Sequence, residues 1–326
     1  MKIIVTGGAG LIGFEVCKQL LGAGHEVHLF DLGEQILRIK KHLPASQNLK
    51  LFCGSIFDLS SLRLAMKDCE IVIHLAALLG VKRSEEEKLS CLEINIIGTK
   101  NVLDCAVQQK VRKIVFSSSS EVYGEPLSNP VSEEAITQGK TVYAITKLAG
   151  EELCKGYSQE YPLKYTILRY FNCYGPFQTA QFVLPKFIKN VMENKPPVIF
   201  GDGEQIRSYT YVSDTAKATV LAALSDKADG QILNIGNGRE PISLKDLASL
   251  VIEILAKEKG LKPEFRSFEN SDRRKEREIV KRFCSSEKAE KLLGWKPEVS
   301  LREGIKKVFE AGVIFERWAN LYDEQN

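Results

Sequence analysis

The stretch Val5-Thr-Gly-Gly-Ala-Gly-Leu-Ile-Gly13 decides the fold, because it lies between an apolar run, Lys2-Ile-Ile-Val-Thr6, and a helical pattern over Leu11–Leu21. Its glycines fit both G-x-G-x-x-G and G-x-x-G-x-x-G. Glycine lets the backbone turn sharply and come close to a pyrophosphate, whose charge is met by the amides and dipole at the start of a helix. The stretch therefore predicts a dinucleotide-binding turn between a strand and a helix.

An aspartate supports this interpretation. Asp31 closes the next apolar run, Glu26–Phe30, about 20 residues after the glycines, where a carboxylate can accept hydrogen bonds from the ribose of adenosine. The same negative charge would repel a 2′-phosphate. The pattern therefore favours NAD over NADP.

Short apolar runs alternate with helical patterns over the first half of the chain. The runs lack polar alternation, as strands do when both faces of their sheet are covered. The order strand, helix, strand predicts parallel βαβ units and hence an α/β fold with a doubly wound parallel sheet. The expected strands are Lys2–Thr6, Glu26–Phe30, Leu49–Cys53, Glu70–Leu75, Lys113–Phe116 and Tyr165–Arg169. The expected helices are Leu11–Leu21, Leu59–Met66, Asn95–Gln108 and Tyr143–Tyr161.

The rhythm changes after about residue 170, where prolines interrupt the segments. We expect a dinucleotide-binding domain at 1–170, with strand contributions from about 205–240. Residues 171–326 should form mainly a smaller substrate-binding domain, partly interleaved with the first. In this part we expect strands at Val198–Phe200 and Ile232–Ile235, and helices at Leu244–Lys257 and Ser286–Leu293.

Composition excludes several functional classes. The 326 residues are 44% hydrophobic and 27% charged with a net charge of +3, which is typical of a globular protein and gives no reason to expect nucleic acid or an anionic membrane as a partner. The eight cysteines contain no C-x-x-C, so they indicate free thiols in a reducing cytosol. No run approaches the ~18 apolar residues of a membrane span. We expect a cytoplasmic protein without a metal site, with His28 and His74 as core residues.

Tyr143 and Lys147 are one helical turn apart and share a helix face. A free phenol titrates near ~10, so a tyrosine base needs a pKa about 3 units lower at neutral pH. Lys147 and a cationic nicotinamide could together provide that stabilisation. A Tyr-x-x-x-Lys pattern alone is common on helix surfaces, but beside a dinucleotide fold it indicates a catalytic pair.

The octapeptide Ser117-Ser-Ser-Ser-Glu-Val-Tyr-Gly124 directly follows the apolar run Lys113–Phe116. It is either a solvated serine loop or the end of a buried strand that brings hydroxyls and a carboxylate to a reaction centre. Doubly wound sheets bind ligands at the carboxyl ends of their strands. That placement favours the second interpretation.

Over nearly its whole length the chain resembles the extended short-chain dehydrogenases/reductases of the nucleotide-sugar epimerase/dehydratase group. The motifs that carry the resemblance are Thr6–Gly13, His74–Ala77, Asn95–Thr99, Ser117–Gly124, Tyr143–Lys147, Arg169–Pro176, Arg207–Asp214, Asn234–Gly238 and Leu292–Pro297. They are much more specific for the family than for one reaction.

The resemblance implies a role for each matching residue. Ser119 would complete a triad with Tyr143 and Lys147, with Glu121 as a further candidate catalytic group. The implied NAD contacts are Gly7, Gly10, Leu11, Ile12, Gly13, Asp31, Ser55, Ile56, Leu75, Ala76, Ala77, Asn95, Ser117, Tyr143, Lys147 and Tyr170. The implied substrate contacts are Ser119, Ser120, Glu121, Tyr143, Asn172, Arg207 and Arg273.

One of these assignments departs from the family's pattern, and another stays open. Relatives usually carry Gly-Asp after the third strand, where this chain has Gly54-Ser55, so a hydroxyl would replace a carboxylate near adenine. A planar guanidinium suits a diphosphate, but the segment 271–278 does not distinguish Arg273 from Arg274 or Arg277 as the second arginine.

The leading hypothesis is an NAD-dependent nucleotide-sugar 4-epimerase that acts through a transient 4-keto sugar, with a UDP-sugar as the expected substrate. The alternative is a UDP-glucuronate-type decarboxylase, since Ser120-Glu121 resembles the Ser-Glu of that group and lacks the Asp-Glu pair of 4,6-dehydratases. A non-catalytic NAD-binding regulatory module is disfavoured because Tyr143 and Lys147 are both present. The resemblance also implies a homodimer formed through 95–108 and 143–161. The sequence leaves the nucleotide and the sugar open.

Overall fold

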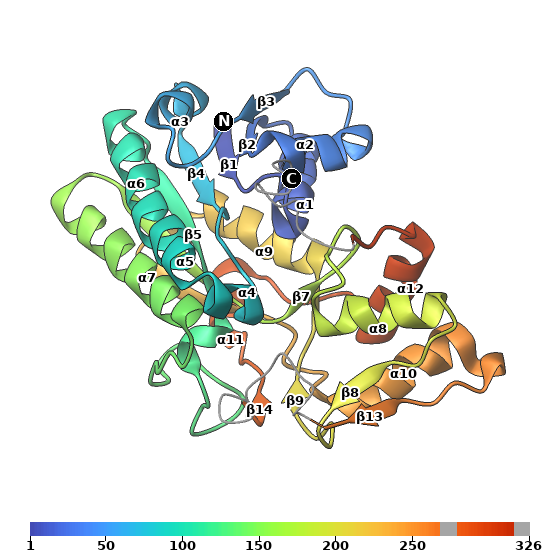
Figure 1. Cartoon of the computed structure of the whole chain (residues 1–326). Helices are drawn as coiled ribbons and strands as arrows, with labels where there is room; N and C mark the ends of the chain where they lie inside the picture. The colour runs from blue at the N-terminus through green and yellow to red at the C-terminus, as the bar shows by residue number, and fades with distance from the viewer. Residues whose placement is uncertain (268–278, 316–326) are drawn as a thin grey trace.

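A parallel seven-stranded sheet forms the centre of the molecule (Figure 1). The computed structural model describes residues 1–267 and 279–315. Every neighbouring pair of strands in this sheet is parallel. In spatial order the strands are β11 (Gln231–Ile235), β6 (Lys164–Tyr170), β5 (Lys113–Ser119), β4 (Ile71–His74), β1 (Lys2–Thr6), β2 (Glu26–Asp31) and β3 (Leu49–Cys53). The doubly wound α/β fold predicted from the sequence is confirmed.

Helices cover both faces of this sheet, and alternate strand residues divide between the two faces. Ile3 and Val5 of β1 lie in one apolar core, while Ile4 between them lies in the other. The first core contains α1 (Leu11–Gly22), α9 (Val212–Leu224) and α11 (Glu287–Leu293). The second contains α3 (Leu59–Met66), α6 (Gly98–Gln108) and α7 (Val142–Glu160). Burial on both faces explains why the strands lack polar alternation.

A smaller unit with its own apolar core lies beside the sheet (Figure 1). Its main helices are α8 (Val183–Met192), α10 (Leu244–Ala256) and α12 (Leu301–Ala311). The strands outside the main sheet are β7 (Cys173–Tyr174), β8 (Val198–Phe200), β9 (Ile206–Arg207), β10 (Thr210–Tyr211), β12 (Ile242–Ser243), β13 (Glu264–Arg266) and β14 (Lys281–Arg282). Although α9 and β11 come after residue 170, they pack with the main sheet.

The remaining elements are short. The α-helices are α2 (Gly33–Ile39), α4 (Val81–Glu86) and α5 (Lys88–Leu92). The 3-10 turns are η1 (Lys40–His42), η3 (Ser120–Tyr123), η4 (Asp226–Ala228) and η5 (Lys257–Lys259), and η2 (Glu93–Ile97) is a π turn. The sequence predicted a helix from Asn95, but residues 95–97 belong to the π turn η2 and α6 begins at Gly98. The π turn that precedes α6 buries the Asn95 side chain against the chain after β4.

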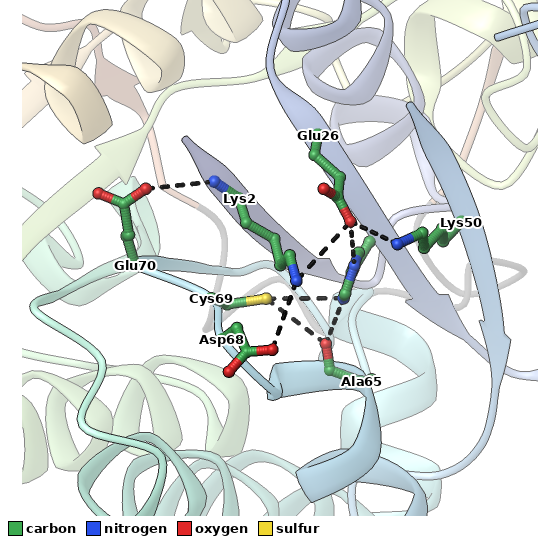
Figure 2. A network of polar contacts seen from close by, with 8 residues as sticks. Lys2, Glu26, Lys50, Ala65, Asp68, Cys69 and Glu70 are labelled. Carbon is green, nitrogen blue, oxygen red and sulfur yellow. Dashed lines mark hydrogen bonds and ion pairs between the residues drawn. The ribbon is translucent and has the colours of Figure 1, made fainter. Parts of the chain in front are cut away.

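Two histidines lie in the core, as the sequence predicted. His74 contacts the hydroxyls of Thr6 and Thr99, at 2.7 and 3.1 Å. The ring of His28 lies 2.6 Å from the carbonyl oxygen of Ala65 and 3.2 Å from the carboxylate of Glu26. Glu26 belongs to a polar network with Lys2 and Lys50 at the amino ends of β1 and β2 (Figure 2). In the part of the chain that the structure describes, no three potential ligand side chains gather as a metal site would require. Within the same residues no helix has the length and apolarity to span a membrane.

Candidate active site

The glycine turn packs directly against the chain that follows β4. Gly7 has a φ of +70°, and a Cβ added there would lie 2.6 Å from the amide nitrogen of Ala76. A Cβ on Gly13 would collide with the carbonyl oxygen of Gly7. Only glycine fits at both positions, because a side chain on Gly7 would push the turn away from the chain after β4, and one on Gly13 would push α1 away from the turn. The backbone is thereby free of side chains where a pyrophosphate would approach the start of α1.

Asp31 at the end of β2 holds the glycine turn in place. Its carboxylate accepts hydrogen bonds from the amides of Ala9 and Leu32, at 2.9 and 2.8 Å. Burial raises the pKa of Asp31 to about 6, although these two amides act in the opposite direction. Each oxygen keeps a further lone pair for a ribose hydroxyl. Ser55 lies just after Gly54, whose amide bonds the carbonyl of Asp31 at 3.0 Å, so both residues lie at the same edge.

Ser119, Tyr143 and Lys147 come together at the carboxyl end of β5. The Ser119 hydroxyl lies close enough to the Tyr143 phenol to lower its pKa. The ammonium of Lys147 donates to the carbonyl oxygen of Ser117 at 2.7 Å and lies 5.6 Å from the centre of the Tyr143 ring. The serine block is therefore part of the strand: β5 runs to Ser119, and the turn η3 begins at Ser120. The interpretation of a strand end, rather than a solvated loop, is confirmed.

The electrostatics of this group differ from the expectation. Lys147 is only 3% exposed, and burial lowers its pKa to about 8. Burial and the charge of Glu121 raise the pKa of the Tyr143 phenol, while the Ser119 hydroxyl lowers it. In the chain by itself the pKa of Tyr143 is therefore raised, and the joint effect of Lys147 and a bound nicotinamide stays a prediction. Desolvation of a buried phenolate outweighs an ammonium more than 5 Å from the ring centre.

The predicted coenzyme contacts from β4 and the π turn lie next to the glycine turn. Leu75 bonds Thr6 through its amide at 3.0 Å, and Ala76 abuts Gly7; Ala77 follows directly. The Asn95 side chain accepts from the Leu78 amide at 2.8 Å and donates to the Leu78 carbonyl at 3.0 Å. Asn95 is 2% exposed. Its amide therefore fixes the loop after β4, and a direct coenzyme contact from it stays a prediction.

The other predicted coenzyme contacts are largely apolar side chains in the two cores. Leu11 packs with the core of the smaller unit and Ile12 with the α1 side of the sheet. Ile56 is 7% exposed and covers Gly98 at the start of α6. The Tyr170 hydroxyl lies 2.8 Å from that of Thr219 on α9. Their contacts with NAD remain predictions.

The two predicted diphosphate ligands are held against backbone carbonyls. The Asn172 amide donates to the carbonyl of Ser208 at 2.9 Å. Asn172 has a φ of +34°, a conformation that asparagine tolerates better than most residues. The Arg207 guanidinium donates to the carbonyl of Ile279 at 2.6 Å. Arg273, Arg274 and Arg277 lie outside the described residues.

Arg282 is a site residue that the sequence analysis missed. It is 2% exposed and forms an ion pair with Glu121, whose side chain is 20% exposed. Its Nε atom has no hydrogen-bond partner among the described residues. Strand β14 pairs with β9 so that Arg282 lies opposite Arg207. The available signal was the apolar Ile279-Val280 immediately before Lys281-Arg282, which separates this short strand from the charged run at 271–278.

A glycine turn that approaches a sheet this closely, with a serine, a tyrosine and a lysine at the adjoining strand end, defines a dinucleotide-dependent enzyme of the short-chain dehydrogenase/reductase class. Residues 3–236 match the model of the NAD dependent epimerase/dehydratase family, and the chain belongs to that family. Its coenzyme is accordingly NAD.

Relatives in this family catalyse more than one reaction. The chain is 34% identical to a UDP-N-acetyl-alpha-D-glucosaminuronate decarboxylase of Bacillus cytotoxicus, over 95% of this chain and 97% of the relative. It is 33% identical to a UDP-glucuronate 4-epimerase of Thermodesulfobacterium geofontis, over 93% and 94%. A Bacillus cereus UDP-glucuronic acid 4-epimerase, solved with UDP-glucuronic acid and NAD, is 32% identical with a TM-score of 0.86, covering 95% of this chain and 98% of that one.

Proposed function

We propose that the protein is an NAD-dependent nucleotide-sugar 4-epimerase that acts through a transient 4-keto sugar. The observation that carries this proposal is the meeting of Ser119, Tyr143 and Lys147 at the carboxyl end of β5, with only β4 between this strand and the one that leads into the glycine turn. Two groups that can exchange a proton with a sugar hydroxyl lie there together with a buried cation. This is what the reversible oxidation of an alcohol requires.

The residues of the chain divide the work as follows. Ser119 orients the 4-hydroxyl of the sugar, and Tyr143 as phenolate removes its proton. Bound NAD would supply a reversible hydride acceptor for carbon 4. Lys147, close to the tyrosine ring, holds the nicotinamide ribose. A cationic nicotinamide beside Tyr143 would favour the phenolate, which the chain by itself does not.

Inversion requires the sugar ring to present its other face before the hydride returns. Asn172 and Arg207 would hold the nucleotide diphosphate, so that binding energy lies away from the ring and the ring stays free to turn. We infer a UDP-sugar as substrate, since the B. cereus 4-epimerase was solved with UDP-glucuronic acid. NAD is regenerated in every cycle and should stay bound.

The proposal is tested by incubating the purified protein with UDP-, GDP-, CDP- and dTDP-sugars and identifying the products by mass and proton NMR. One nucleotide sugar should be converted into its 4-epimer with no change in mass. Tyr143→Phe should retain NAD and lose turnover by about 10³-fold. A Tyr143→Phe variant that turns over at the wild-type rate would remove the proposed base.

A second candidate, decarboxylation of a UDP-glucuronate-type substrate after the same oxidation, is favoured by the ion pair between Glu121 and Arg282. The charge of Glu121 raises the pKa of Tyr143, so the ion pair lies close to the proposed reaction centre. The guanidinium of Arg282 would suit a sugar carboxylate in charge and shape if the substrate displaced Glu121 from it. Decarboxylation lowers the product mass by the lost carbon dioxide, so the same panel separates the two reactions.

We also propose that the protein is a homodimer formed through α6 and α7. Apolar side chains are exposed along this face: Ile97 just before α6 is 48% exposed and Ile145 on α7 is 52% exposed. Ile145→Glu should convert the dimer into a monomer in analytical ultracentrifugation. Leu37→Glu on α2, at a residue 68% exposed, is the matched control and should leave the mass unchanged.

A further inference from the structure

Three residues of α7 at successive helical turns meet three successive serines of β5. Tyr143 faces Ser119, whose hydroxyl lowers the pKa of the phenol, and Lys147 donates to the carbonyl of Ser117. Glu151 completes the row, because its carboxylate accepts a hydrogen bond from the hydroxyl of Ser118 at 2.5 Å. Residues four apart lie on one face of a helix. The proposed reaction uses the first two contacts and leaves the third without a role.

The third contact belongs to a buried ion pair. Arg169 of β6 donates to both carboxylate oxygens of Glu151, at 2.9 and 2.7 Å. Ser118 and Arg169 are direct partners in the pairing of β5 with β6, so Glu151 bridges two adjacent strands. Glu151 is 1% and Arg169 4% exposed. Such a two-pronged pair fixes direction as well as distance between its partners.

The network continues into the turn after β5. Arg169 donates to the phenol oxygen of Tyr123 at 2.9 Å, and the Tyr123 hydroxyl donates to Asn234 of β11 at 2.7 Å. Tyr123 closes the turn η3, which also contains Glu121. The ion pair therefore holds Ser118, directly before Ser119, and Tyr123, in the turn directly after Ser119.

We propose that Glu151 and Arg169 are a positioning pair for the reaction: by fixing Ser118 and Tyr123 they set the place of Ser119 opposite Tyr143. The inference rests on the proposed function, since it concerns the same site. A buried ion pair is by itself weak evidence for stability, because desolvation offsets the attraction. What points to positioning is that the contacts of this pair flank Ser119 on both sides.

Ser118→Ala tests the proposal with the smallest change. The ion pair stays intact while the strand end loses its tie to Glu151. We expect kcat to fall about tenfold and KM for the nucleotide sugar to change less than about threefold, with the NAD content unchanged, because small displacements at a reaction centre affect turnover more than binding. Thr166→Val is the matched control: it removes a buried hydroxyl that bonds the carbonyl of Ala228 at 2.7 Å. Thr166→Val should lower the melting temperature about as much as Ser118→Ala does, and it should leave kcat unchanged.

A second variant pair tests the role from the side of the helix. Glu151→Gln leaves Arg169 buried without a carboxylate, so it should lose both stability and turnover. Glu151→Gln combined with Arg169→Gln removes both charges and should recover the melting temperature without recovering kcat. Recovery of both would show that the pair only stabilises the fold. If these variants do not fold, Ser118→Ala decides.

A crystal structure of the NAD-loaded Ser118→Ala protein separates this inference from the proposed function. The hydrogen bond between Ser119 and Tyr143 should be lost in the variant and present in the wild type. If the wild type converts none of the nucleotide sugars, the proposed function fails, and this structural readout still decides the positioning role. Retention of the Ser119–Tyr143 bond, or a kcat within twofold of wild type in an active enzyme, overturns the inference.

Discussion

Two buried lysines lie at opposite ends of β5 and have different surroundings. Lys113 begins β5, is fully buried, and pairs with Asp229 at 2.8 Å while donating to the carbonyls of Ala222 and Ser225. Lys147 reaches the other end of β5, and no carboxylate of residues 1–267 or 279–315 lies within ion-pair distance of its ammonium. A cation paired with a carboxylate ties elements together, whereas a desolvated cation without a carboxylate partner is available for chemistry.

Replacing Lys147 should produce the largest effect of the comparison. Lys147→Met should reduce turnover by about 10²-fold or more, because the group proposed to hold the nicotinamide ribose in place is lost. The free energy of unfolding should stay the same or rise, because a desolvated charge is replaced by an apolar side chain. Steady-state kinetics and urea unfolding measure the two quantities. Loss of stability with retained turnover would remove the distinction between the lysines.

Lys113→Met should show the opposite pattern. Removal of the ammonium leaves Asp229 and two carbonyls without their buried donor, at a cost of about 3 kcal/mol in the free energy of unfolding. Lys164, which also pairs with Asp229 at 2.6 Å, limits the loss. Turnover of the folded fraction should match wild type. A kinetic defect equal to that of Lys147→Met would show that the amino end of β5 also serves the reaction.

The pH dependence sharpens the comparison further. Burial lowers the pKa of Lys147 from 10.5 to about 8, so the lysine is a cation below about pH 8 and turnover should fall as the pH rises above it. Stability should change in the opposite direction. Between about pH 8 and 10.5 Lys147 carries a proton in the unfolded chain but not in the folded one, so the free energy of unfolding should increase as the pH rises through that range. Turnover that stays constant from pH 7 to 10 would contradict a role for the cation.

The smallest effect concerns the network in Figure 2, at the amino end of the sheet. Hydrogen bonds from Lys50 and His28 lower the pKa of Glu26 to about 2. Glu26 therefore contributes stability above pH 4.5 that is lost as the pH falls toward about 2. Because its side chain is 32% exposed, Glu26→Gln should cost under about 1 kcal/mol at pH 7 and leave turnover unchanged. An effect of Glu26→Gln on kcat would show that the amino end of the sheet also contributes to the reaction.

The sequence was sufficient to predict the strands of the main sheet, although not the helix α9 that packs on it, and to bring Ser119, Tyr143 and Lys147 together at the carboxyl end of one strand. Buried strands are continuous apolar runs, and Gly7 and Gly13 occupy positions where any side chain would collide, so both signals are local. Helical spacing places Tyr143 and Lys147 on one face of a helix, and the predicted dinucleotide turn and serine block identify them as a catalytic pair. The serine block was harder, since serine has little preference for strands. Pairing with β6 extends β5 to Ser119 all the same.

The parts that escaped prediction depend on contacts between distant segments. Glu121 meets Arg282, which is 161 residues further along the chain, and Arg282 lies in a two-residue strand too short to show periodicity. Glu151 and Arg169 are 18 residues apart, but only the pairing of β5 with β6 brings Ser118 to them. The raised pKa of Tyr143 depends on burial, which spacing does not show.

The most direct test of the central claim follows a deuterium atom at carbon 4. The NAD-loaded protein is incubated with 4-deuterated UDP-glucose and 4-deuterated UDP-glucuronate, and the products are analysed by mass spectrometry and proton NMR. If Tyr143 and Ser119 support a hydride transfer that returns to the other face of the sugar, one substrate yields its 4-epimer with the deuterium retained and the mass unchanged. Loss of the label to solvent, or products without inversion at carbon 4, would contradict the account.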